Sequence, residues 1–237
     1  MRKRLGPSTL GPNSVGPTTL GRTTFGAGTL GVGILAALAF SVQAARSEDA
    51  VRFAPLKAEE LSPPQKAWAD MISAPPRNAK FTAPPYRAYI RNPDLAPKLS
   101  NLSEYLRWNT SLPARLSEMA ILITARHWTA QYEWSAHYPL AMKGGLDPKL
   151  ADAIAKGTRP EGMKDDEAAL YDLGIAIYRD RKVSDAVYKA ALEKFGERGM
   201  MDIIGIMGYY DLVSMTLITM QAGSANASVP PLPVLEK

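Results

Sequence analysis

The stretch that decides the fold reads Leu112-Pro-Ala-Arg-Leu-Ser-Glu-Met-Ala-Ile-Leu-Ile-Thr-Ala-Arg-His-Trp-Thr-Ala-Gln-Tyr-Glu-Trp-Ser-Ala-His137. Its apolar residues recur at three- and four-residue intervals, which is the spacing of one helix face. Pro113 stands at a first-turn position, where its missing amide hydrogen costs no helical hydrogen bond. The pattern predicts two consecutive helices over 113–129 and 131–143, and a hairpin of the two would bring side chains from both into one pocket.

Helix signals continue on both sides of this stretch. Starts are marked by Pro148 and by the capping residues Asp147 and Ser184, and ends are marked by glycines such as Gly157 and Gly196. No segment shows the two-residue alternation of a strand over a useful length. The signals predict further helices over 94–109, 148–156, 164–180, 185–195 and 199–221. The expected fold class is therefore all-α, with a helical bundle over 94–222.

The helix expected over 199–221 is apolar around most of its circumference. Such a helix must be buried on most sides. Its length would allow a membrane span, but Asp202, Asp211 and the pair Tyr209-Tyr210 argue against one. We expect it to lie in the core of the bundle, partly against another subunit.

Proline-rich segments flank the expected bundle. Residues 45–93 form an extension with one short helix over 64–72, which Ser62 would cap, and with extended chain elsewhere. Residues 223–237 form a tail that we expect to pack as an extended arm or to stay mobile.

Residues 1–44 have the features of a targeting segment. They contain basic residues, no acidic ones, a Gly-Pro pentapeptide repeat and an apolar run over 30–42. The run is too short for a comfortable membrane span, and small residues before Ala45 suit cleavage after Ala44. We expect a disordered leader that is removed from an exported protein (periplasmic or secreted). An uncleaved membrane anchor and an organelle transit peptide are the alternatives.

The composition narrows the possible chemistry. The 237 residues carry a formal charge of +5, but removing residues 1–44 takes away four basic residues and leaves +1. The charge therefore gives no reason to expect a nucleic-acid partner, nor a membrane partner once the leader is cleaved. The absence of cysteine excludes disulfides, thiolate metal sites and thiol nucleophiles. With only two histidines, a multi-histidine metal centre is excluded as well.

Three side chains of the opening stretch are candidates for acid/base chemistry. Glu133 and His137 are four residues apart and share a helix face, and Glu118 lies among apolar residues of the preceding helix. A carboxylate buried there requires a partner. The three groups together would suit proton transfer, since histidine titrates near neutral pH. We expect His127 at the surface or an interface; a metal site that combines it with these three groups is the less favoured alternative.

The chain resembles the carboxymuconolactone decarboxylase family, which includes the alkylhydroperoxidase D-like proteins. The matching features lie between Leu112 and Met220, and are Leu-Pro-Ala-Arg-Leu-Ser-Glu118, Ala-Arg126, Tyr132-Glu-Trp-x-x-His137, Gly-Leu146, Val183-Ser-Asp185 and Gly208-Tyr-Tyr210. The resemblance implies an all-helical fold that assembles into trimers or hexamers, with a pocket for a small-molecule substrate near a subunit interface. It also implies a reaction that needs no metal or organic cofactor.

The chain departs from the peroxidase branch of that family. The branch carries a Cys-x-x-Cys-x-x-x-His motif, whose cysteine positions fall on Ala130 and Glu133 here, with His137 as the histidine. The departure favours the decarboxylase branch, and hence a lyase that acts on a small carboxylated lactone. We expect His137 to donate the proton, Glu133 and Glu118 to tune it, and Arg126 to bind a substrate carboxylate. Aromatic side chains expected to line the pocket are Tyr132, Trp134, Tyr209 and Tyr210.

Two other functions stay open at this level. One is a non-catalytic helical protein of the same fold that serves in binding or assembly. The other is an alkylhydroperoxidase-like protein without thiol chemistry.

Overall fold

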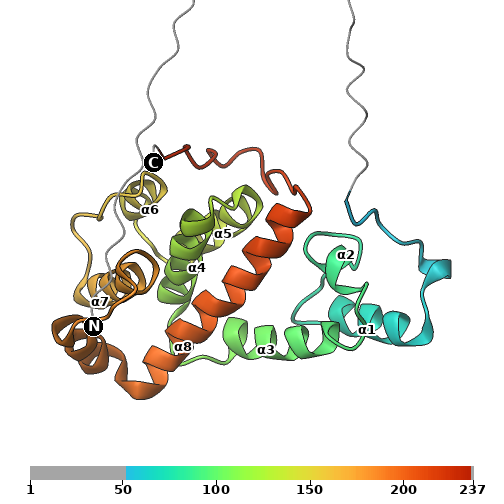
Figure 1. Cartoon of the computed structure of the whole chain (residues 1–237), viewed down its shortest axis with the longest axis horizontal. Coiled ribbons are helices and arrows are strands. Elements are labelled where there is room, and N and C mark those ends of the chain that lie inside the picture. The colour runs from blue at the N-terminus through green and yellow to red at the C-terminus, as the bar shows by residue number, and fades with distance from the viewer. Residues whose placement is uncertain (1–51, 236–237) are drawn as a thin grey trace, which may run out of the picture. The chain divides into compact units, whose positions relative to one another are not determined.

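The computed structural model describes residues 52–235, and all regular elements in this range are helices (Figure 1). The all-helical prediction is confirmed. The targeting segment over 1–44 lies outside the described residues. The elements are η1 (Ala58–Glu60), α1 (Pro63–Ser73), α2 (Tyr86–Tyr89), α3 (Ala96–Trp108), α4 (Ala114–Trp128), α5 (Gln131–Lys143), α6 (Pro148–Ala155), α7 (Asp165–Ile175), η2 (Ala176–Asp180) and α8 (Asp185–Thr219).

The α4–α5 hairpin lies at the centre of the fold. Thr129 and Ala130 connect the two helices, and Thr129 takes a left-handed conformation with φ of 52°. The amides of Thr129 and Ala130 donate to the carbonyls of Arg126 and Ala125, which closes the end of α4. This turn reverses the chain, so α5 packs along α4 as the sequence predicts.

The expected break between the last two helices lies at Gly196. The helical pattern runs from Asp185 to Thr219, but Gly196 has φ of 62° and ψ of 178°, which is not helical. Only glycine adopts such a conformation readily. The chain therefore changes direction at this residue, and the long part after it packs against α4 and α7.

The part of α8 after Gly196 is apolar and largely a core element. Ile203, Ile206 and Leu217 are buried. Asp202 is also buried and accepts hydrogen bonds from the Tyr105 hydroxyl (2.7 Å) and the Ser111 hydroxyl (2.7 Å). Among the described residues, α8 is the one helix long and apolar enough to cross a membrane, and half of its most apolar window is buried in the protein.

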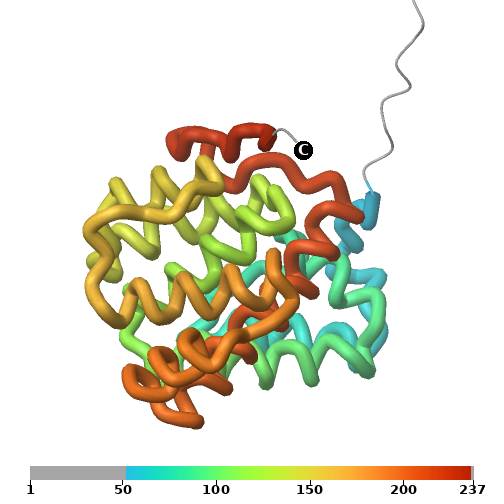
Figure 2. Tube along the Cα trace, turned by 60° about the vertical axis from the view of Figure 1, so that its left-hand side comes forward, coloured from blue at the N-terminus to red at the C-terminus, as the bar shows by residue number. Residues whose placement is uncertain are grey.

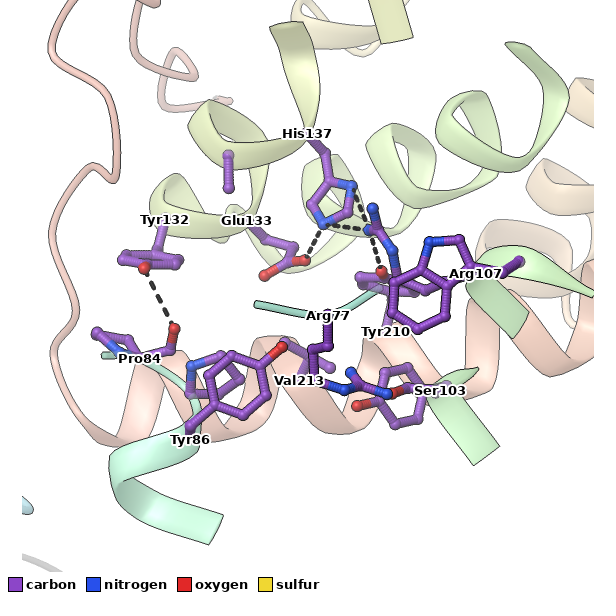
Figure 3. Close-up of a pocket in the computed structure, with 14 residues that line it drawn as sticks. Arg77, Pro84, Tyr86, Ser103, Arg107, Tyr132, Glu133, His137, Tyr210 and Val213 are labelled. Carbon is purple, nitrogen blue, oxygen red and sulfur yellow. Dashed lines mark hydrogen bonds and ion pairs between the residues drawn. The ribbon is translucent and has the colours of Figure 1, made fainter. Parts of the chain in front are cut away.

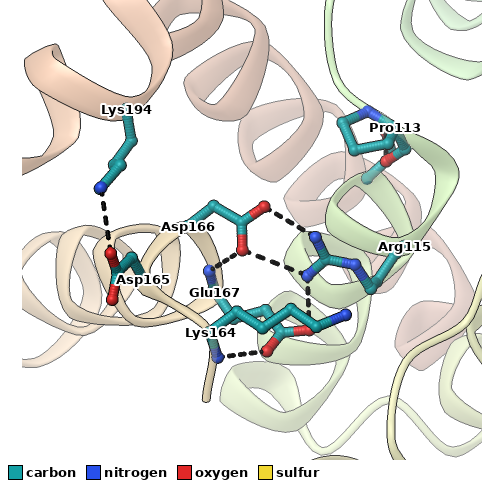
Figure 4. A network of polar contacts seen from close by, with 8 residues as sticks. Pro113, Arg115, Lys164, Asp165, Asp166, Glu167 and Lys194 are labelled. Carbon is teal, nitrogen blue, oxygen red and sulfur yellow. Dashed lines mark hydrogen bonds and ion pairs between the residues drawn. The ribbon is translucent and has the colours of Figure 1, made fainter.

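An ion-pair network joins the first turns of α4 and α7 (Figure 4). Arg115 pairs with Asp166 at 2.7 Å and with Glu167, whose side chain is buried. The second carboxylate oxygen of Glu167 accepts the backbone amide of Lys164 at 2.7 Å. The network therefore fixes the position of α7 on α4 and caps the start of α7.

The proline-rich extension is more helical than predicted. Helix α1 confirms the expected short helix, but η1 and the one-turn α2 lie in stretches that were expected to be extended. Trp68 of α1 is buried, and its indole nitrogen donates to the Ser100 hydroxyl at 2.9 Å. Packing against α3 therefore orders this segment beyond what its proline content indicates.

The tail after α8 runs across the ends of earlier helices without forming a helix (Figure 2). Gln131 holds Leu232 through a donated and an accepted hydrogen bond, each of 2.9 Å. Arg126 donates to the carbonyl of Pro233 at 2.7 Å. Over 223–235 the tail is thus an extended arm, one of the two predicted states.

Candidate acid/base site

His137 lies between two carboxylates, one from each helix of the hairpin. Its Nδ1 is 2.6 Å from Oε2 of Glu118 in α4, and its Nε2 is 2.9 Å from Oε1 of Glu133, one turn away in α5. All three side chains are buried. The predicted convergence of these residues is confirmed at hydrogen-bond distance, with one carboxylate on each ring nitrogen.

The environment of His137 favours its protonated form. Burial lowers the pKa of the imidazole, but the negative charges and hydrogen bonds of Glu133 and Glu118 outweigh that effect and raise the pKa to about 9. At neutral pH the ring is therefore an imidazolium that donates a hydrogen bond to each carboxylate.

Arg107 completes this cluster and was not predicted from the sequence. It comes from α3, and its Nη1 donates to the Tyr210 hydroxyl at 2.9 Å. Its Nη2 lies 3.7 Å from Oε1 of Glu118. Two cations thus face two carboxylates, so the buried cluster has no net charge. No local sequence motif identifies Arg107 as a site residue. It reaches the cluster because α3 packs against α8.

A cavity of about 260 Å³ opens at this cluster (Figure 3). This volume lies just below the usual range for ligand pockets, roughly 300–1,000 Å³. Glu133 and His137 lie on one side of the cavity, and Arg77 and Tyr86 lie opposite (Figure 3). Its aromatic walls come from Tyr86, Trp108, Tyr132, Tyr209 and Tyr210. Cations and flat rings around a small space suit a small, planar, anionic molecule.

The proline-rich extension supplies part of the cavity wall. Arg77 donates to the carbonyl of Ser100 at 2.9 Å, and its guanidinium lies 5.1 Å from the centre of the Trp108 ring. The Arg107 guanidinium lies 6.0 Å from the same ring. Tyr132 donates to the carbonyl of Pro84 at 3.2 Å and so ties the extension to α5. Nothing in the local sequence marks Arg77 as a site residue, since it lies far from the hairpin in the chain.

Arg126 does not line this cavity. It is buried at the end of α4, where it donates to the carbonyls of Ala155 (3.0 Å) and Pro233 (2.7 Å) and to the Thr129 hydroxyl (2.6 Å). The prediction that Arg126 binds a substrate carboxylate at the acid/base site is therefore wrong. The arginines that line the cavity are Arg107 and Arg77. Helix spacing could not show this, because Arg126 and Glu133 lie on either side of the hairpin turn.

The other expected residues divide between the cavity and its surroundings. Tyr132, Tyr209 and Tyr210 line the cavity, and the Tyr210 ring meets the His137 ring edge-on at 5.0 Å between centroids. Trp134 does not line it and is buried in the core. His127 is exposed and stacks on Tyr178 at 4.1 Å, away from the acid/base cluster. Within residues 52–235, no group of three or more acidic or histidine side chains has the arrangement of metal ligands.

Comparison with protein-family models found no match, and comparison with curated proteins found no significant relative. Among solved structures, the chain is similar to a protein of unknown function from Agrobacterium tumefaciens that is described as a candidate antioxidant defence protein AhpD. The TM-score is 0.48 and the sequence identity 12%, over 57% of this chain and 94% of the other. This likeness is too distant to assign an activity to the chain.

Proposed function

We propose that the protein is a cofactor-free lyase that removes a carboxylate from a small unsaturated lactone acid. One observation carries the proposal: His137, held at hydrogen-bond distance between Glu118 and Glu133, lines a cavity with arginine and aromatic walls. The chemistry requires a cation to hold the substrate, a donor for the developing oxyanion and an acid to protonate carbon. The cavity presents a candidate for each.

Arg77 is the candidate for binding the substrate in its reactive orientation. Within the described residues its guanidinium has a carbonyl and an aromatic ring as partners but no carboxylate, so its charge is available to an anion. Arg107 is balanced by Glu118 and supports the cluster. A flat lactone ring would lie against the tyrosine and tryptophan rings, with a carboxylate toward Arg77.

The proton path runs through Glu133. Both ring nitrogens of His137 are held by carboxylates, so the imidazolium has no free N–H for a substrate. Glu133 also lines the cavity and engages His137 through one oxygen. We therefore assign the direct transfer to Glu133 and the resupply of its proton to His137, in place of the direct donation by His137 that the sequence favoured. Glu118 stabilises His137 as a cation.

The proposed step balances in atoms and charge. The carbon–carbon bond to the carboxylate breaks and releases carbon dioxide, and its electron pair moves into the unsaturated lactone as a dienolate. The Tyr210 hydroxyl, which accepts from Arg107, can donate its own hydrogen to the developing oxyanion. His137 passes its Nε2 proton to the Glu133 carboxylate, Glu133 delivers a proton to the dienolate carbon, and solvent then returns a proton to His137.

The proposal is tested by measuring carbon dioxide release from a panel of unsaturated lactone acids with the full chain. We expect release from at least one compound, and a loss of about 10²- to 10⁴-fold in kcat in Glu133→Gln, because proton transfer by a positioned side chain contributes about that much. Glu104→Gln is the matched control, since Glu104 is exposed on α3 and should leave kcat unchanged. Tight binding of these acids without release would contradict the proposal and favour a binding protein.

A further inference from the structure

A second cavity, of about 570 Å³, shares no lining residue with the cavity at the acid/base cluster. The C-terminal end of α4 and the helices α6 and α7 form it, and the tail lies along one side. Its walls are mainly apolar and include Ile123, Ile154, Tyr171 and Ile175. This volume falls within the range of binding pockets, roughly 300–1,000 Å³. The cavity has no part in the proposed lyase reaction.

The charged residues around this cavity are of one sign, since Arg126 and Arg179 line it and none of the described lining residues is acidic. His127 also lines it, but burial lowers the pKa of its imidazole, so the ring is neutral at neutral pH. Arg179 is paired with its neighbour Asp180 at 2.7 Å. Arg126 is only 7% exposed, and its partners are two carbonyls and one hydroxyl. Its positive charge is therefore buried with neutral partners.

The guanidinium of Arg126 also has an unused donor. Its Nε is buried and has no hydrogen-bond partner in the described part of the chain. A buried cation with an unpaired N–H is costly unless an anion compensates it. An anionic group at this wall of the cavity would balance the charge of the guanidinium, whose Nε itself is enclosed by protein atoms.

The tail forms one wall of this cavity. Arg126 and Gln131 hold its backbone at Pro233 and Leu232. Leu235 lies so close to Gly157 that a Cβ there would come within 2.8 Å of Leu235 Cδ1. Gly157 also has φ of +70°, so the turn itself favours glycine.

From these observations we infer that the second cavity binds an amphipathic monocarboxylate, with its carboxylate at the Arg126 wall and its hydrocarbon body among Ile123, Ile154 and Ile175. The apolar walls favour a hydrocarbon body over a sugar or nucleotide. The uncompensated Arg126 favours a carboxylate head over an alcohol.

Isothermal titration of the full chain with decanoate, below its micelle concentration, tests this inference. We expect one-to-one binding, and binding of 1-decanol at least about tenfold weaker because it lacks the charge. Arg126→Gln should weaken decanoate binding by a similar factor. Because that change could unfold the chain, Ile175→Trp, which fills the cavity, is the second variant. Circular dichroism of both variants checks that each is folded.

Two further variants test whether decanoate binds in this cavity or at another place on the protein. Arg77→Gln alters the acid/base cavity and should leave decanoate affinity unchanged. Affinity lost in Arg77→Gln but kept in Ile175→Trp would overturn the inference. A chain shortened by residues 236–237 should bind decanoate as the full chain does. Binding seen only after that shortening would also overturn it, since the chain's own terminus would then be the occupant. No binding by either chain would overturn it equally.

Discussion

At the scale of single residues, His137 has an unusual pair of partners. An imidazole with a carboxylate on each nitrogen remains charged at neutral pH, and here it lies in a buried cluster with Arg107. Glu133 stands where the Cys-x-x-Cys-x-x-x-His motif would place a cysteine. A carboxylate can take up and release a proton, but it cannot take part in thiol–disulfide exchange.

The raised pKa of His137 predicts how stability depends on pH. The folded protein holds the proton up to about pH 9, whereas the unfolded chain loses it near 6.5. The group thus stabilises the fold fully below pH 6.5, and this contribution is lost as the pH rises through 9. Urea unfolding should show a loss of a few kcal/mol across that window. The loss should be absent in His137→Gln; an equal loss in this variant would contradict the assignment.

The sequence predicted the residues of this cluster that belong to one local pattern. Glu133 and His137 are related by helix spacing, and Glu118 was identified as a carboxylate on an apolar face. Arg107 and Arg77 were not identified because each is an ordinary charged residue in its own segment. Their role depends on contacts with residues outside their own segments, as the contact of Arg107 with Tyr210, 103 positions away, shows. Helix periodicity contains no information about such contacts.

At the scale of elements, the helix boundaries follow from local chemistry. The two-residue turn at Thr129 and Ala130 and the break at Gly196 are set by backbone conformation, and both lie where sequence signals predicted. Helix α2 lies in a proline-rich stretch with weak local signals. It forms in contact with the core, where Tyr89 is buried and the Tyr86 ring lies 6.3 Å from the Trp68 ring, tilted by 47°. Tertiary packing outweighs local preference there.

The network at Arg115 yields a prediction for the α4–α7 contact. Arg115→Ala would leave the buried Glu167 without its cation, and breaking such a pair costs about 3–5 kcal/mol. Urea unfolding of the variant should show a loss of this order. The control is Arg159→Ala, since the Arg159–Asp172 pair is exposed and should contribute at most about 1 kcal/mol. Equal losses of unfolding free energy in the two variants would contradict the prediction that the buried pair contributes more than the exposed pair.

At the scale of the whole molecule, the acid/base cavity is assembled from four separated parts of the chain. The extension contributes Arg77 and Tyr86, α3 contributes Arg107, α5 contributes Glu133 and His137, and α8 contributes Tyr210. The extension, which sequence analysis set apart from the bundle, is therefore a wall of the site. The helical fold could be predicted from the sequence, but the composition of the cavity could not, because it depends on how these parts pack.

Deuterium incorporation tests the central claim, proton delivery by Glu133, most directly. When the full chain acts in D₂O on a lactone acid that it decarboxylates, the product should carry one deuterium at the dienolate carbon that takes the proton. A positioned donor delivers it to one face, so the product should have a single configuration, and Glu133→Gln should form it about 10²- to 10⁴-fold more slowly than Glu104→Gln. Deuterium on both faces, or an undiminished rate in Glu133→Gln, would contradict the account.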